Sequence, residues 1–216
     1  TIDPNIGIVD VVDERLDQLT KLSNSKKKVY TNITFVDIAG LVKGASEGEG
    51  LGNKFLSHIR EVDAIIHLVR CFESDKITHV NSKINPVDDL ETIKTEIILS
   101  DLDIIQKKLE KGKKKLLGER EIKILEDKLI QLNDGKEVTA NNKDEEKFLS
   151  NLGLLSIKPK IIVCNVDEES LGKGNPFTED IKKNYSEEKV VTICADIEDQ
   201  IMGLDKNERE TFMKEI

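Results

Sequence analysis

The residues best suited to chemistry in this chain follow short apolar runs. Asp37-Ile-Ala-Gly40 ends the run "ITFVDIAG", and four more glycines follow within twelve residues. An aspartate at a strand end can hold Mg²⁺, and a glycine three residues later lets its backbone N–H approach a γ-phosphate because it has no Cβ. The D-x-x-G pattern is weak alone, since a strand end with a turn glycine has the same form. The apolar run before it and the glycines after it favour a phosphate-sensing segment.

A second polar group follows the apolar run "IIVCNVDEE", where Asn165, Val166 and Glu168 stand in an N-x-x-E pattern. Guanine-specific proteins place N-K-x-D here, and its aspartate accepts from guanine N1–H and the exocyclic amine. The side chain of Glu168 is longer than that of aspartate and does not fit these two guanine donors in the same way. Strict guanine selectivity is therefore not expected, and ATP becomes a candidate ligand. The alternative is a polar loop that caps the next helix.

A third segment, Cys194-Ala195-Asp196 in "VVTICADIED", follows the last apolar run. The guanine-specific proteins mentioned above carry an S-A-K-like loop after their corresponding strand. The small residues of that loop let the backbone approach the base. This signal has almost no weight alone, and it gains weight only from its order and spacing after the other two.

Apolar runs must position these groups, and four of them predict buried strands. They span Ile33–Ile38, Ala64–Val69, Ile161–Cys164 and Val190–Cys194. Continuous apolar runs favour a parallel sheet covered on both faces. Gly7–Val12 is a candidate fifth strand, and the leucines that follow it predict a short helix.

The middle of the chain predicts helices. Ile84–Leu132 keeps apolar residues at helical spacing, with two glycines near a plausible turn, and predicts two long antiparallel helices. The polar segment Asn133–Glu146 predicts a mobile connection. The sequence thus predicts an α/β core formed by residues 1–83 and 157–216, with a helical coiled-coil insertion at 84–156.

Composition limits the function classes. Charged residues make up 35% of the chain and the net charge is −9, which disfavours generic binding to nucleic acid or anionic lipid. Cys71, Cys164 and Cys194 are far apart without C-x-x-C spacing, and we expect reduced, buried thiols of a cytoplasmic protein. The sequence indicates neither a membrane span nor a signal peptide.

In this order and spacing the segments resemble the YchF/Obg-like ATPase family, a branch of the Obg-related translation-factor GTPases. The resemblance is carried by "TIDPN", the 39-residue stretch Phe35–Glu73, "INPVDDLETIKTEIILSDLD" and the N-x-x-E loop. It implies a P-loop NTPase G-domain fold with a mostly parallel sheet and an inserted α-helical coiled-coil hairpin. It also implies hydrolysis of ATP or GTP with Mg²⁺ and association with the ribosome or RNA.

The resemblance further implies site residues. Thr1 and Asp37 would meet Mg²⁺, and Gly40 would contact the γ-phosphate. Leu41 falls where Ras-like proteins place the water-orienting glutamine, so another group must position the water. The implied nucleotide-binding residues are those of the second and third segments above: Asn165, Val166, Glu168, Cys194, Ala195 and Asp196.

The sequence departs from the family pattern because it contains no G-x-x-x-x-G-K-[ST]. The family's phosphate-binding loop lies upstream of "TIDPN", and its C-terminal TGS domain lies beyond Ile216. We therefore expect a fragment that is inactive alone. The alternative from another class is a non-hydrolytic binding module that uses the helical arm to contact protein or RNA; Lys107–Arg120, with six lysines, would form its tip. A degenerate G domain with only a structural role is a third option.

Overall fold

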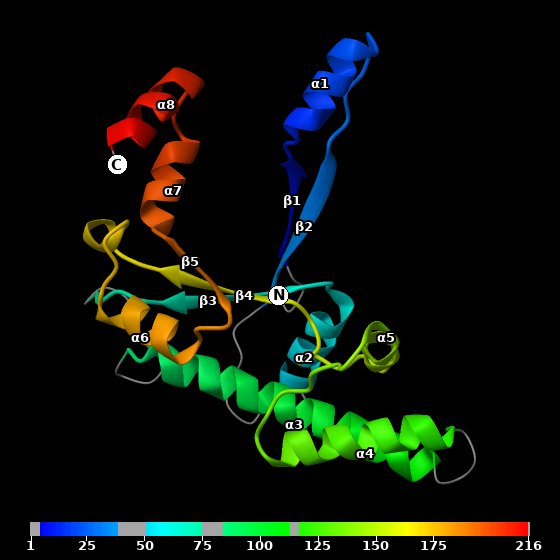
Figure 1. Cartoon of the computed structure of the whole chain (residues 1–216). Coiled ribbons are helices and arrows are strands. Elements are labelled where there is room, and N and C mark those ends of the chain that lie inside the picture. The colour runs from blue at the N-terminus through cyan, green and yellow to red at the C-terminus, as the bar shows by residue number, and fades with distance from the viewer. Residues whose placement is uncertain (1–4, 39–50, 75–83, 113–116, 216) are drawn as a thin grey trace.

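A three-stranded parallel sheet forms the centre of the molecule. The computed structural model describes residues 5–38, 51–74, 84–112 and 117–215. The sheet has the order β3-β4-β5, with β3 at Ile65–Arg70, β4 at Lys160–Asn165 and β5 at Lys189–Ile193. Its register pairs Arg70 with Asn165 and Asn165 with Ile193, so the carboxyl ends of all three strands meet at one edge (Figure 1).

An antiparallel hairpin precedes the sheet and projects away from it (Figure 1). Strand β1 (Asn5–Val11) pairs with β2 (Thr31–Asp37), and α1 (Glu14–Leu22) lies between them at the tip. Asp13 begins α1 because its carboxylate accepts from the backbone N–H of Arg15 at 2.9 Å. Both the candidate fifth strand and the short helix after it are thereby confirmed.

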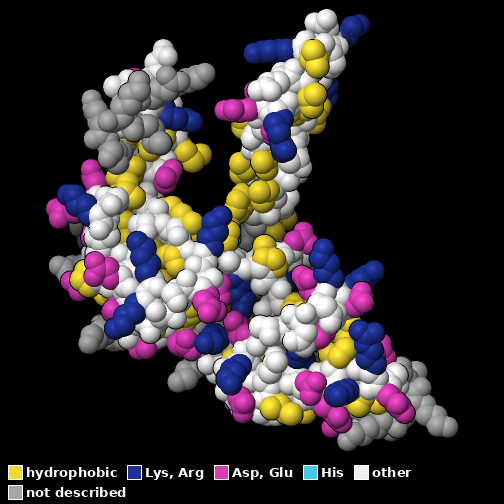
Figure 2. Space-filling model, viewed as in Figure 1, with side chains coloured by type: hydrophobic (Ala, Val, Ile, Leu, Met, Phe, Trp, Pro, Cys, Tyr) yellow, Lys and Arg dark blue, Asp and Glu magenta, His cyan; other side chains and the backbone are white. Residues whose placement is uncertain are grey.

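The expectation of a buried parallel strand at Ile33–Ile38 is wrong. This run lies in β2, whose only described neighbour is the antiparallel β1, and the apolar side chains along the hairpin are largely exposed (Figure 2). Ile33 and Phe35 keep 51% and 44% of their surface exposed. A two-stranded ribbon that stands apart from the central sheet has no second layer on either face among the described residues.

The helices form the rest of the structure. Long helix α3 (Pro86–Gly112) runs beside α4 (Glu119–Asn133), which confirms the two long paired helices (Figure 1). The other helices, in chain order, are α2 (Leu51–Glu61), α5 (Lys143–Asn151), the 3₁₀ turn η1 (Glu168–Ser170), α6 (Pro176–Asn184), α7 (Ala195–Met202) and α8 (Lys206–Glu215).

Helix α3 joins the parts of the core. Along its length, α3 gives Leu90 to the cluster that packs against the sheet, Ile97 to a cluster with α2, and Ile105 to the cluster shared with α4 and α5. Asp101 of α3 adds a buried polar link, since its carboxylate accepts from the backbone N–H groups of Leu155 at 2.8 Å and Ser156 at 2.9 Å. Burial raises the pKa of Asp101, against these hydrogen bonds. The turn that leads into β4 is therefore fixed to α3.

The segment Asn133–Glu146 is not the mobile polar connection expected from its composition. Val138 is 2% exposed within the core shared by α3 and α4, and its N–H donates to Ser156 Oγ at 3.3 Å. Glu145 forms a buried ion pair with Lys128 of α4, with 2.6 Å between Nζ and Oε1. The segment packs α5 against the helical pair.

The face of the molecule seen in Figure 2 carries positive and negative side chains interspersed. None of the helices in the described part of the chain combines the length and the apolar character needed to cross a bilayer. Cys71, Cys164 and Cys194 are free and buried, as expected.

Candidate functional site

Two of the predicted loops meet at the carboxyl edge of the sheet. Strand β4 ends at Asn165 and β5 at Ile193, and these residues are register partners. The N–H of Val166 donates to the carbonyl of Ile193 at 2.9 Å, which continues the pairing one residue past the strand. The segments that begin at Asn165 and Cys194 therefore lie side by side. This is the place at which open parallel sheets bind ligands.

Asn165 connects three strand ends. Its side-chain Oδ1 accepts from the N–H of Ala195 at 3.0 Å, and its backbone carbonyl accepts from the N–H of Cys71, just past β3, at 2.8 Å. Ala195 is the first residue of α7, and the N-cap residue Cys194 makes no side-chain capping bond. Asn165 thus caps α7 from the neighbouring strand. The capping alternative seen in the sequence is realised, although on a different helix from the one expected.

The side chains of Val166 and Cys194 are each 2% exposed and belong to the core cluster under the sheet. The side chains of these two residues are therefore not available to a ligand. Beneath the loops, Cys71 and Cys164 are both fully buried. The Cys164 thiol beside it and burial raise the pKa of Cys71 well above its ordinary value, so this thiol stays neutral.

The two carboxylates of the predicted site lie on the solvent side. Glu168 is the first residue of the η1 turn and Asp196 lies in the first turn of α7, and both are exposed. Asp167 starts the η1 turn by accepting from the N–H of Ser170 at 2.9 Å. Exposed Glu168 and Asp196 therefore lie at the same edge of the sheet as the buried residues Val166 and Cys194. Exposed carboxylates suit a ligand with hydrogen-bond donors, such as a nucleobase amine.

Of the two predicted metal residues, the structure describes Asp37, which does not belong to this edge. Asp37 ends β2 in the separate hairpin, where it pairs with Asn5 and is exposed. Thr1, Gly40 and Leu41 lie outside the described residues. Within the described ranges, no three His, Cys, Asp or Glu side chains gather as metal ligands. A single carboxylate fits Mg²⁺, because that ion keeps several waters and takes further oxygens from substrate phosphates.

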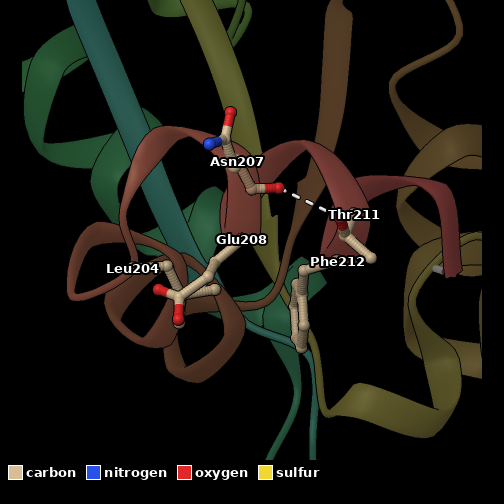
Figure 3. Close-up of a pocket in the computed structure, with 5 residues that line it drawn as sticks. All are labelled: Leu204, Asn207, Glu208, Thr211 and Phe212. Carbon is tan, nitrogen blue, oxygen red and sulfur yellow. Dashed lines mark hydrogen bonds between the residues drawn. The ribbon is translucent and has the colours of Figure 1, made fainter.

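A hollow of about 430 Å³ lies elsewhere, along α8 and the turn before it (Figure 3). Its polar groups are engaged locally: Thr211 Oγ1 donates to the carbonyl of Asn207 at 3.0 Å, and Glu208 accepts from the N–H of Asp205 at 3.0 Å. None of the predicted site residues lines it. The hollow adds nothing to the candidate site.

Sequence reasoning missed Asn175, which begins α6 and reaches back to the carboxyl edge of the sheet. Its amide donates to the carbonyl of Cys71 at 2.6 Å. The dipeptide Asn-Pro before "FTED" signals a helix start, and that much is readable from the sequence. The contact with Cys71 is not readable, because it depends on the alignment of β3 and β4.

Comparison with known proteins finds similarity to ribosome-binding GTPases and ATPases. The profile of the 50S ribosome-binding GTPase family matches residues 1–108. The ribosome-binding ATPase YchF of Bacillus subtilis is 43% identical over 229 residues, and that of Escherichia coli O157:H7 is 42% identical over 225 residues; each alignment covers 100% of this chain and 62% of the relative.

A solved structure, the YchF GTPase of Schizosaccharomyces pombe, superposes with a TM-score of 0.82 at 32% identity, over 100% of this chain and 62% of that chain. This chain therefore spans about 62% of the length of the relatives it matches.

Proposed function

The chain belongs to the YchF branch of the 50S ribosome-binding GTPase family, and from this membership we propose that it supplies most of the G domain of an ATP-hydrolysing switch. The observation that supports the proposal most is the joining of the loops after β4 and β5 by two hydrogen bonds, from Val166 N–H to Ile193 and from Ala195 N–H to Asn165. These bonds hold the two segments that we propose for base recognition at one edge of the sheet.

We propose that the base lies against Asn165 and Glu168 on one loop and against the backbone of Ala195 on the other. The exposed Glu168 carboxylate can accept a hydrogen bond from the N6 amine of adenine. Guanine N1–H and the exocyclic amine both donate to one aspartate carboxylate in guanine-specific proteins. A glutamate is one methylene longer than that aspartate, so its carboxylate would not lie at the same position. ATP is therefore the favoured nucleotide, with GTP as the weaker ligand.

The phosphate side of the proposal rests on the family pattern. Thr1 and Asp37 would hold Mg²⁺, Gly40 would donate its N–H to the γ-phosphate, and Leu41 would leave the orientation of water to another group. When bound, the ion would neutralise charge on the β- and γ-phosphate oxygens. Asp37 is exposed at the end of β2, where its carboxylate is accessible to such an ion or to its waters.

The curated relatives are named ribosome-binding ATPases, and we propose the same partner for this chain in the cytoplasm. We propose the division into residues 1–83, 84–156 and 157–216. Its middle segment contains the long α3–α4 pair, which would provide the surface for that partner. The rival is a binding module that uses this helical arm and hydrolyses nothing.

Ribosome association under different nucleotides separates the two functions. The experiment uses the extended protein, which is this chain preceded by the family's phosphate-binding loop, in sedimentation with ribosomes. A switch predicts that the bound fraction differs between ATP and ADP, because the γ-phosphate orders the segments that sense it. A bound fraction that is the same with ATP, ADP and no nucleotide would favour the binding module.

Charge reversal at the tip tests which surface meets the ribosome. Lys113, Lys114 and Lys115 lie outside the described residues, between α3 and α4. Changing all three to glutamate should weaken association by about tenfold or more at low salt, since each lysine lost removes one phosphate contact, while ATP hydrolysis by the extended protein stays unchanged.

The matched control reverses three exposed lysines around α6 and the start of β5: Lys182, Lys183 and Lys189. These lysines lie away from the helical tip, so their reversal should leave association nearly unchanged. Equal loss in both triple variants would mean that net charge, rather than the tip, governs association.

A further inference from the structure

We propose that Asn175 is a positioning residue that holds the loop carrying Glu168 against the end of β3, and so sets base selectivity. The proposal rests on the proposed function, because it assigns Asn175 a role in presenting Glu168 to the base. The loop in question runs from Val166 to Gly174, between β4 and α6.

The Asn175 amide bridges two segments. Its Nδ2 donates to the carbonyl of Cys71, just past β3, at 2.6 Å, and to Ser170 Oγ at 3.2 Å. Ser170 is the last residue of the η1 turn, and Glu168 is the first. One side chain thus ties the turn that carries Glu168 to the strand beside β4.

The orientation of this amide is fixed from its other side. Its Oδ1 accepts from the N–H of Thr178 at 3.0 Å, which makes Asn175 the N-cap of α6. Thr178 is fully buried, and its Oγ1 accepts from the N–H of Asn175 at 2.9 Å. With both amide atoms engaged, the side chain has one favourable orientation, in which Nδ2 points at Cys71.

The backbone before Asn175 is adapted to the same contact. Gly174 has φ +78°, and a Cβ there would lie 3.1 Å from Thr178 Oγ1. Its N–H donates to the carbonyl of Ser170 at 2.8 Å, which closes the loop on itself. A glycine at this position allows both the left-handed conformation and the close approach. The Asn175 contact thereby restrains the whole loop, including Glu168.

The competing explanation is that Asn175 is only a helix cap. Asn175→Ser separates the two roles, because a serine hydroxyl still caps α6 but cannot span to both Cys71 and Ser170. Asn142→Ser is the matched control: Asn142 is the N-cap of α5, accepts from the N–H of Glu145 at 3.0 Å, and lies outside the loops of the candidate site. Both changes convert an asparagine cap to a serine cap.

The first measurement is amide hydrogen exchange on this chain without nucleotide. Asn175→Ser should speed exchange at Leu171 and Gly174 by about tenfold, since the bonds that their N–H groups make close a loop no longer held to Cys71. Asn142→Ser should leave these amides unchanged. Unchanged exchange in Asn175→Ser would overturn the proposal.

The second measurement is steady-state hydrolysis by the extended protein with ATP and with GTP. Asn175→Ser should raise KM for ATP by about tenfold, the effect of losing a hydrogen bond that preorganises the site, and reduce the ATP-to-GTP ratio of kcat/KM. kcat should stay the same, because the proposal gives Asn175 no part in holding the phosphates or the metal. Faster exchange with an unchanged selectivity ratio would overturn the positioning role.

An unmodified extended protein that hydrolyses neither nucleotide would instead contradict the proposed function. The exchange result would still stand as a test of the loop contact.

Discussion

Replacing Asp37 with alanine is expected to lower kcat for ATP by about 100-fold or more in the extended protein. A metal that polarises phosphoryl oxygens contributes several kcal/mol to transition-state stabilisation, and each 1.36 kcal/mol is a factor of about ten in rate. Asp37 is the one proposed metal residue that the structure describes, and its side chain is exposed at the end of β2. Its removal should therefore affect metal binding without disturbing packing. Phosphate release across a Mg²⁺ titration measures the effect.

Asp10→Ala is the control for this change. Asp10 is an exposed aspartate on the paired strand β1, opposite Asn32, so its loss changes the charge of the same hairpin away from the proposed metal site. We expect unchanged kcat and an unchanged Mg²⁺ midpoint. If Asp37→Ala retained full activity at the same Mg²⁺ midpoint, the metal assignment would be wrong.

Breaking the buried Lys128–Glu145 pair is expected to have the largest effect on stability. Lys128 is 1% exposed, and Lys128→Met would leave the Glu145 carboxylate buried with only the Asn141 amide as a partner. The loss of one partner from a buried pair lowers the free energy of unfolding by about 3–5 kcal/mol. Urea unfolding of this chain at neutral pH measures it. Lys128→Met with Glu145→Met should recover most of the loss, since no buried charge remains.

An exposed pair on α3 provides the comparison. Lys107 and Asp103 are 2.7 Å apart with 66% and 58% of their side chains exposed, so Lys107→Met should change the free energy of unfolding by less than about 1 kcal/mol. Equal effects of Lys128→Met and Lys107→Met would show that burial of the first pair carries no energetic weight.

The pH dependence of the buried pair follows from Glu145. Burial acts to raise its pKa, but the Lys128 ammonium and the Asn141 amide outweigh burial and hold the pKa below the ordinary value of 4.5. A carboxyl whose pKa is lower in the folded state stabilises the fold above its unfolded pKa. That contribution is lost as pH falls below 4.5 through the folded pKa.

Periodicity predicted the elements that local sequence determines. The helical spacing through Ile84–Leu132 gave α3 and α4, and the apolar runs near Ile161 and Val190 gave β4 and β5 in a parallel sheet. Helices α3 and α4 and strand β4 each bury apolar residues at the period of the element, so their pattern appears in the sequence. The neighbouring positions of the loops after β4 and β5 follow from the pairing of these two strands, because parallel strands end at the same edge of a sheet.

The elements that were missed depend on contacts between distant residues. The apolar run Ile33–Ile38 predicts a strand but not its neighbours. Its antiparallel pairing with β1 and the exposure of its side chains depend on residues that are distant in the sequence. The letters "NNKDEE" look solvated because a glutamate is rarely buried, yet Glu145 meets Lys128 across two helices. Asn175 likewise signals a cap, whereas its bond to Cys71 spans 104 positions.

Calorimetric titration of ATP and GTP tests the central claim most directly. The claim is that this chain holds the base-recognition edge of a nucleotide site whose phosphate-binding loop lies upstream in the family. We expect the extended protein to bind ATP, and GTP more weakly, and this chain alone to give no binding heat with either nucleotide. The absence of binding heat from both nucleotides with the extended protein, in the presence of Mg²⁺, would contradict the account.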